Sequence, residues 1–305
     1  MKLDNDRTHF VLFGLLALMW SGSFINIKVV VDVMPPVFCA MIRVLISLIC
    51  LGIFFTLMGK PFSFRKSEGI WRIWLAGIFT QALPFGLLFY GEKFIAPALA
   101  SIINSTVSLW ALLLGACIYR DTTQWTPLKI SGLLLGFLGI IIIFTPSLSQ
   151  GESDIIGIIA IMAMAISYAI GGLINQHVIF PKMNVTFETN LFQQHVSSVI
   201  VLLIASLSME SWPNIHLLLN AHVMLAFLYL GLVATAIAWI IYFYLIKHWG
   251  AVRTSSVMYI VPVLAIMWDL LFLHIIPSTT ELTGAAAILT GVVLVQWKRR
   301  NPNPI

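Results

Sequence analysis

The sequence predicts an all-α integral membrane protein of ten transmembrane helices, arranged as two inverted five-helix repeats. Three observations lead to this fold class. Hydrophobic residues make up 60% of the chain and charged residues only 10%, which is outside the range of soluble domains. Long apolar runs fill the chain on both sides of one short polar segment, residues 146–157. The two sides also carry identical residues at matching positions.

Ten apolar runs are each long enough to cross a bilayer. A transmembrane helix needs about 20 apolar residues, and runs this evenly apolar indicate helices rather than barrel strands. The first run follows a start that resembles a signal peptide. It continues to Val31 without a clean A-x-A cleavage site, so we expect a retained helix. The expected spans are residues 9–30, 35–57, 70–91, 97–118, 126–145, 155–176, 188–207, 221–245, 251–273 and 280–297.

The polar segment divides the chain into two halves with five runs each. Five crossings leave a chain on the far side of the membrane, so we expect the second half to run in the opposite sense. The expected units are a first five-helix repeat, 1–145, a periplasmic linker, 146–157, and a second five-helix repeat, 158–305, with a short basic cytoplasmic tail.

A gap-free shift tests the repeat. Moving residues 77–111 forward by 154 positions gives eight identities, none of them Leu or Ile, the residues that match most often by chance. Two inverted halves are a transporter architecture, with the substrate site between them near the midplane. The matching residues are Gly77, Ala82, Phe89, Tyr90, Lys93, Ser101, Val107 and Ala111 with Gly231, Ala236, Phe243, Tyr244, Lys247, Ser255, Val261 and Ala265.

Basic residues predict the orientation, because cytoplasmic loops carry an excess of Lys and Arg. With the N-terminus inside, only Lys28 and Lys93 fall at outer ends. We therefore expect both termini in the cytoplasm and a location in the cytoplasmic (inner) membrane. The inner set is Lys2, Arg7, Lys60, Arg65, Lys66, Arg72, Arg120, Lys129, Lys182, Lys247, Arg253, Lys298, Arg299 and Arg300.

The segment YLGLVATAIAWIIYFYLIKHWGAVRTSSVMYIVPVLAIMWDLLFL, residues 229–273, followed by LTGAAAILTGVVLV, resembles the second repeat of the EamA-type drug/metabolite transporters. The first half resembles the same family through LALMWSGSFINIK, NSTVSLWALLLGACIYRD and ISGLLLGFLGIIII. The pattern departs from the family at Ser108, where a proline is common, whereas its partner Pro262 is present. Family members usually carry an acidic residue at the end of the fourth helix. Asp121 stands at that position in the first half, whereas Ile275 stands at the matching position of the second half.

Midplane depth selects the candidate substrate-binding residues. Amides and aromatic rings near the bilayer centre should face partners or a wet cavity, because unpaired polar groups in hydrocarbon cost several kcal/mol. Packing between helices is the alternative role of these side chains. The resemblance implies that the first, third, fourth, sixth, eighth and ninth helices line a cavity. The candidates on them are Trp20, Gln81, Phe85, Asn104, Tyr168, Trp239 and Tyr259.

Two charged residues fall inside expected spans. Arg43 should face protein or water, because a buried arginine on an isolated helix costs roughly 2.5–3.5 kcal/mol on insertion scales. Asp269 either pairs with Arg43 across the repeat interface or lies in the wet headgroup zone, and we favour the headgroup zone. His195 is expected to be a hydrogen-bonded structural histidine.

An aromatic and amide lining indicates an organic solute held by stacking, cation–π contacts and hydrogen bonds. No central carboxylate is expected, which argues against a metal cation, and the sequence gives no catalytic signature, metal motif or cofactor motif. The expected partners are a small organic solute and the lipid bilayer, without nucleic acid, in a monomer or a homodimer.

These patterns favour an alternating-access transporter that exports small organic metabolites, and the resemblance favours amino acids or related zwitterions. An uptake carrier for a choline-like amine or a nucleobase is the alternative, and a membrane-embedded protein without transport activity is the alternative of another class.

Small residues predict one helix contact in particular. Gly132, Gly136 and Gly139 mark a face that allows close backbone approach, and Gly284 and Gly291 repeat it in the second half. We therefore expect the fifth and tenth helices to pack together, away from the cavity.

Overall fold

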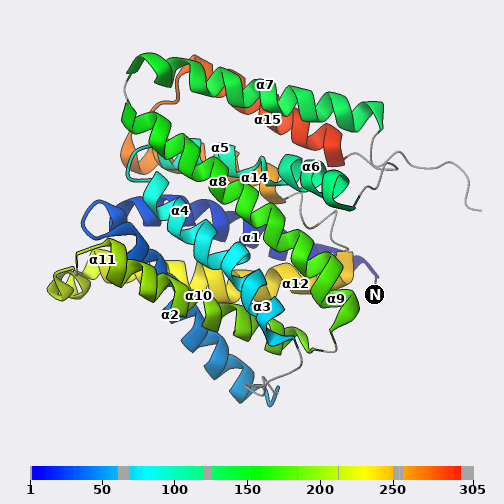
Figure 1. The fold of residues 1–305 in the computed structure, drawn as a ribbon, viewed down its shortest axis with the longest axis vertical. Coiled ribbons are helices and arrows are strands. Elements are labelled where there is room, and N and C mark those ends of the chain that lie inside the picture. Colours follow the sequence, from blue (N-terminus) through cyan, green and yellow to red (C-terminus); the bar gives the residue numbers. More distant parts are fainter. Residues whose placement is uncertain are drawn as a thin grey trace, which may run out of the picture.

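The structure is a computed structural model, and it describes residues 2–60, 69–119, 126–150, 152–183, 185–211, 213–249, 254 and 257–296. These residues form a bundle of helices (Figure 1). Several residues used above lie outside the described ranges, so the structure does not place them. They are Met1, Arg65, Lys66, Arg120, Asp121, Gly151, Arg253, Ser255, Lys298, Arg299 and Arg300, with the tail to Ile305.

The first half contains α1 (Lys2–Val31), α2 (Pro36–Leu57), α3 (Ile70–Gly77), η1 (Ile78–Ala82), α4 (Leu83–Gly91), α5 (Pro97–Asn104), α6 (Val107–Tyr119) and α7 (Pro127–Gln150). The proline that opens α2, α5 and α7 fits the first helical position, where no backbone N–H donor is needed. In this half, α3, η1 and α4 continue one another as a single span, Ile70–Gly91.

The second half contains α8 (Glu152–Ile174), η3 (Asn175–Ile179), α9 (Phe180–Lys182), α10 (Phe187–Met209), η4 (Ile215–Leu219), α11 (Ala221–Leu228), η5 (Tyr229–Ile237), α12 (Ala238–Trp249), α14 (Val257–Trp268), η6 (Asp269–Leu273) and α15 (Thr279–Gln296). η1, η3, η5 and η6 are π-helical, whereas η4 is a 3₁₀ turn.

Seven of the described helices are long and apolar enough to cross a membrane. Three shorter apolar helices lie at the fifth, ninth and tenth expected spans: Pro127–Ile143, Val257–Leu273 and Thr279–Val295. At 1.5 Å per residue a 17-residue helix covers about 25 Å, slightly less than the roughly 30 Å of hydrocarbon. The protein is thus an all-helical, multi-pass membrane protein.

The boundary between the two halves differs from the expected linker. α7 continues to Gln150 and α8 begins at Glu152, so helix replaces most of the polar segment 146–157. Pro146 interrupts the pattern in the sequence but is accommodated within α7.

The packing of α7 against α15 confirms the expected contact between the fifth and tenth helices. Both run along the upper edge of the bundle in Figure 1. A Cβ atom on Gly132 would lie 2.6 Å from the carbonyl oxygen of Gly291, and one on Gly139 would lie 2.7 Å from that of Gly284. The two backbones touch, which only glycine permits.

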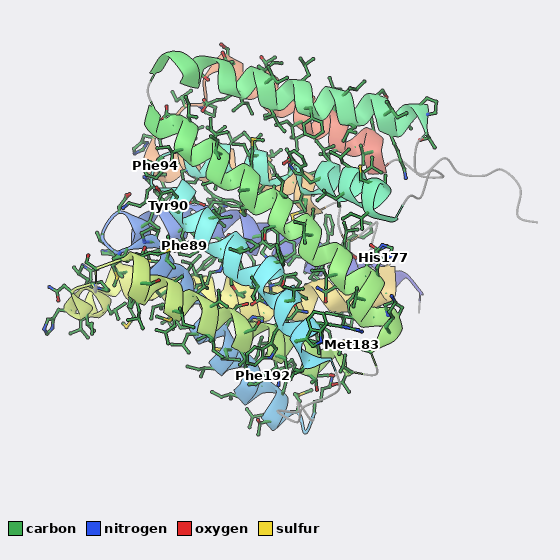
Figure 2. All side chains as sticks on the ribbon, in the orientation of Figure 1. Phe89, Tyr90, Phe94, His177, Met183 and Phe192 are labelled. Atoms are coloured by element: carbon green, nitrogen blue, oxygen red, sulfur yellow. The ribbon has the colours of Figure 1, made fainter. Side chains whose placement is uncertain are left out.

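The two ends of the bundle can be told apart in Figure 2, where Tyr90 and Phe94 lie at one end and His177 and Met183 toward the other. We call them the Phe94 end and the His177 end. The Phe94 end holds the connections 32–35, 92–96, 210–220 and 274–278. The expected orientation makes the Phe94 end the outer one.

Candidate functional site

A cluster of three half-buried aromatic rings joins α1 to α12. The ring centroid of Trp20 lies 6.5 Å from that of Trp239 and 5.3 Å from that of Tyr242, and Trp239 meets Tyr242 edge-on at 5.7 Å. Trp20 and Trp239 were predicted from midplane depth. Tyr242 was not, although it follows Trp239 by three positions and therefore lies on the same helix face.

Arg43 lies at the contact between the two halves. Its side chain is 3% exposed, its Nε donates a 2.9 Å hydrogen bond to Thr235 Oγ1 on η5, and its guanidinium carbon lies 4.1 Å above the ring centre of Phe85 on α4. Phe85 in turn meets Tyr168 of α8 edge-on at 6.3 Å. The structure therefore brings together three predicted residues, Arg43, Phe85 and Tyr168, from three different helices.

Gln81 belongs to a buried row of polar side chains that ends at Ser47, one turn after Arg43 on α2. Its Nε2 lies 3.1 Å from His195 Nδ1, and His195 Nε2 lies 3.1 Å from Ser47 Oγ on α2. His195 is 0% exposed and its Nδ1 also faces the Leu191 carbonyl at 2.9 Å. The expected hydrogen bonding of His195 is confirmed, and its structural role stays a prediction.

Asn104 marks a break in the fourth span. α5 ends at Asn104, residues 105 and 106 form a turn, and α6 begins at Val107. The hydroxyl groups of Ser105 and Thr106 donate 2.6 Å bonds to the carbonyls of Ile102 and Ile103, which satisfies acceptors at the break. Broken helices at membrane depth are tolerated where they line a cavity or are buried in protein.

Two further spans have irregular backbone at mid-depth. η1 interrupts the third span just before Pro84, whose ring removes a donor and clashes with the carbonyl four residues earlier, so the wider π-turn relieves the clash. η5 interrupts the eighth span without a proline and contains Gly231. Gln81 lies on η1 and Thr235 on η5, and the 154-residue shift superposes these two positions in sequence.

Tyr259 and Asp269 lie apart from these residues. The hydroxyl of Tyr259 donates to the Val292 carbonyl of α15 at 3.4 Å, on the side of the bundle that α7 and α15 cover. Asp269 is 0% exposed, and its Oδ2 accepts a 2.8 Å hydrogen bond from the Ala98 N–H at the start of α5. The favoured expectation of a wet headgroup position for Asp269 is therefore wrong.

The alternative, a pair between Arg43 and Asp269, is also not found. The ion pairs among the described residues join Lys28 to Asp32 and Lys60 to Glu188. Arg43 binds a hydroxyl and an aromatic face instead. Asp269 binds the free N–H of a helix start, where the positive end of the helix dipole attracts a carboxylate.

The sequence analysis did not single out two carboxylates that the structure places in unusual surroundings. Glu210 accepts hydrogen bonds from the backbone N–H groups of Val37 and Phe38 at the start of α2. Glu92 follows the last residue of α4 and is 0% exposed. Both lie just outside apolar runs, where sequence reasoning treats a charge as solvated. Among the described residues no group of three or more His, Cys, Asp or Glu side chains could hold a metal ion.

Fold and site together define a multi-pass membrane protein with a polar and aromatic centre between two halves. The model of the EamA-like transporter family matches the chain twice, over residues 9–145 and 155–297. The chain belongs to the EamA-like transporter family.

Curated relatives cover almost the whole chain. An uncharacterized transporter of Bacillus subtilis is 24% identical, over 98% of this chain and 94% of its own. A probable amino-acid metabolite efflux pump of Escherichia coli K12 is 25% identical, over 96% and 98%. A crystal structure with 19% sequence identity matches the fold with a TM-score of 0.65, over 94% of this chain and 97% of the other.

Proposed function

We propose that this protein is an alternating-access carrier that exports amino acids or related zwitterions across the cytoplasmic membrane. Membership of a transporter family gives the class of activity. The names of two relatives, probable amino-acid metabolite efflux pumps of Escherichia coli and Salmonella typhimurium, support the substrate class and the direction.

One observation carries the location of the site. Arg43 Nη1, Gln81 Oε1 and Asn104 Oδ1 are buried and have no hydrogen-bond partner in the structure. Burying such groups without a partner costs about 1–3 kcal/mol each, and more for a charged one. Three such groups on α2, η1 and α5, all at mid-depth, support a site that a polar solute completes.

The charge of Arg43 supports a solute with a carboxylate. No carboxylate lies within ion-pair distance of Arg43 among the described residues. An arginine guanidinium presents a planar set of donors that matches a carboxylate. A permanently cationic solute such as a choline-like amine would be repelled by Arg43 at the same place. The aromatic rings Phe85 and Tyr168 nearby suit an apolar side chain or an ammonium group of a zwitterion.

The irregular helices support movement about the same place. π-Helical segments often occur at functional sites, and interrupted helices at corresponding positions of two halves mark the binding site of inverted-repeat transporters. η1 and η5 satisfy this description. We propose ten crossings in two inverted repeats, 1–145 and 158–305, with both termini in the cytoplasm. Opening then alternates between the Phe94 end, outside, and the His177 end, inside.

Solute counterflow tests the proposal. Proteoliposomes that contain only this protein are loaded with an unlabelled mixture of the twenty protein amino acids and diluted into trace amounts of one radiolabelled amino acid at a time. Transient accumulation of at least one label above protein-free liposomes is expected. The absence of accumulation for every amino acid would reject amino-acid transport, and accumulation of labelled choline or a nucleobase instead would favour an uptake carrier.

A further inference from the structure

Glu92 is an ionisable side chain in an unusual position at the Phe94 end. It stands one residue beyond the span Ile70–Gly91, yet its side chain is 0% exposed and neither carboxyl oxygen has a hydrogen-bond partner. A carboxylate that loses its hydration without gaining a partner is costly to keep charged. Such a group stays neutral by holding a proton.

The charges around Glu92 do not replace the missing partners. Lys28 of α1 donates to the backbone carbonyl of Glu92 at 3.2 Å and pairs with Asp32 at 3.1 Å, so its ammonium group is already engaged. Arg43 of α2 and Lys28 of α1 attract the carboxylate without a direct contact to its oxygens, whereas Asp269 and Asp32 repel it. Burial and the nearby Asp269 together hold the pKa of Glu92 well above its usual range.

The other neighbours are uncharged or point away. α8 packs on α4 beside Glu92 through Gly157 and Ile161, neither of which carries a charge. Lys93, the next residue along the chain, is exposed. No described side chain therefore stabilises the ionised form of Glu92 by direct contact.

Burial of Glu92 depends on closure of the Phe94 end. Two carboxylates on the second half cap helix starts on the first half there: Asp269 binds the Ala98 N–H, and Glu210 binds the N–H groups of Val37 and Phe38. These bonds tie α5 to η6 and α2 to the end of α10. If they part, water reaches the connection 92–96 and can hydrate an ionised Glu92.

We propose that Glu92 is a proton-binding site whose protonation is required to close the Phe94 end. On opening, Glu92 releases its proton to water as a hydronium ion and becomes a carboxylate; on closing, it takes one proton back from the same side and is buried as the neutral acid. Its place in the transport cycle rests on the proposed function: protons from the outer solution then favour return of the carrier to the state that loads solute inside.

The native Cys39 offers a probe of closure that needs no solute. Cys39 lies on α2 directly after Phe38 and is 0% exposed, so a membrane-impermeant maleimide reaches it only when the Phe94 end opens. The assay uses purified full-length protein with Cys50→Ser and Cys117→Ser, and compares it with the same protein carrying Glu92→Gln. Comparison at equal pH cancels the pH dependence of thiol reactivity itself.

The labelling rate of Cys39 relative to the Glu92→Gln protein should rise with pH, by up to about tenfold per pH unit for one linked proton. Glutamine at position 92 cannot ionise, so Cys39 in the Glu92→Gln protein should be labelled slowly at every pH. Equal rates in both proteins at every pH would overturn the proposal. So would a pH response that persists in Glu92→Gln and disappears in Asp269→Asn, because Asp269 would then bind the proton.

Two controls keep the outcome decisive. If Glu92→Gln does not fold, the ratio of Cys39 to Cys50 labelling in a Cys117→Ser protein gives the same measure, with a constant ratio overturning the proposal. Replacing sodium chloride by N-methylglucamine chloride should change nothing; suppression of labelling by sodium at fixed pH would assign the site to a metal cation instead. Because the labelling assay contains no solute, its result for Glu92 stands whether or not amino-acid counterflow is observed.

Discussion

The carboxylate of Glu210 caps the helix that contains Phe38. Its Oε2 accepts the Phe38 N–H at 2.8 Å and its Oε1 accepts the Val37 N–H at the same distance, although the residues are 172 and 173 positions apart in sequence. Ser206 Oγ, one turn earlier on α10, donates to Oε2 and holds the carboxylate in place. A residue of one half thus replaces the local N-cap that α2 lacks, since Pro35 offers no side-chain acceptor.

Glu210→Ala should destabilise the protein. The mutation removes both cap bonds and the charge that favours a helix start, which together correspond to about 1–2 kcal/mol. The melting temperature of the detergent-purified protein should fall. Glu210→Gln retains one acceptor oxygen and should lose less. If Glu210→Ala melts like the wild type, the cap does not hold the two halves together.

Thr235→Val should lower both stability and transport. The Thr235 hydroxyl accepts from Arg43 and donates to the Leu230 carbonyl at 2.7 Å within η5, so valine leaves the buried Nε donor of Arg43 unpaired and removes the side-chain bond to Leu230. Hydrogen bonds to charged groups contribute about 1.5–3 kcal/mol. Thr235→Ser preserves both bonds and should behave nearly as the wild type in melting and in amino-acid counterflow. Equal melting temperatures and equal counterflow of Thr235→Val and Thr235→Ser would show that the hydrogen bond between Arg43 and Thr235 is dispensable.

Much of the fold follows from the sequence because the bilayer restricts the choices. Apolar runs of bilayer length must be helical, and the glycine spacing on α7 and α15 predicted a contact that the backbone geometry confirms. The helix interruptions could be predicted less well. Pro84 signals η1, but η5 contains no proline, and its nine π-helical residues depend on packing against α1 and α2.

The charged residues show where sequence reasoning stops. Arg43 was expected to face protein or water, and its hydrogen-bond partner is Thr235, a contact over 192 positions that no local pattern contains. Counting from span ends places Asp269 in the headgroup zone and does not single out Glu92 or Glu210. Their surroundings depend on tertiary packing at the Phe94 end. Glu210 and Asp269 accept hydrogen bonds from N–H groups at helix starts, whereas the carboxyl group of Glu92 has no hydrogen-bond partner.

The glycine contact between α7 and α15 can be tested with a matched pair. Gly132→Ala places a Cβ atom 2.6 Å from the Gly291 oxygen and forces the backbones apart, which should reduce the yield of folded monodisperse protein and lower its melting temperature. Gly172 in α8 has no atom within 4 Å of an added Cβ. Gly172→Ala should therefore be neutral or stabilising, by up to about 1 kcal/mol, since alanine favours helices over glycine. Equal effects of both substitutions would reject close packing.

The candidate site is tested most directly by comparing two tryptophans. Trp20 contacts Trp239 and Tyr242 inside the bundle, whereas Trp71 is 63% exposed at the start of α3. Trp20→Ala removes a stacking face from the proposed site and should reduce counterflow of the accepted amino acid at least tenfold, the effect of about 1.4 kcal/mol. Trp71→Ala removes the same side chain from the surface and should leave counterflow unchanged. Gln81→Ala, which removes one of the unpaired buried acceptors, should resemble Trp20→Ala. If Trp20→Ala and Gln81→Ala proteins fold and transport as well as Trp71→Ala, the solute binds elsewhere.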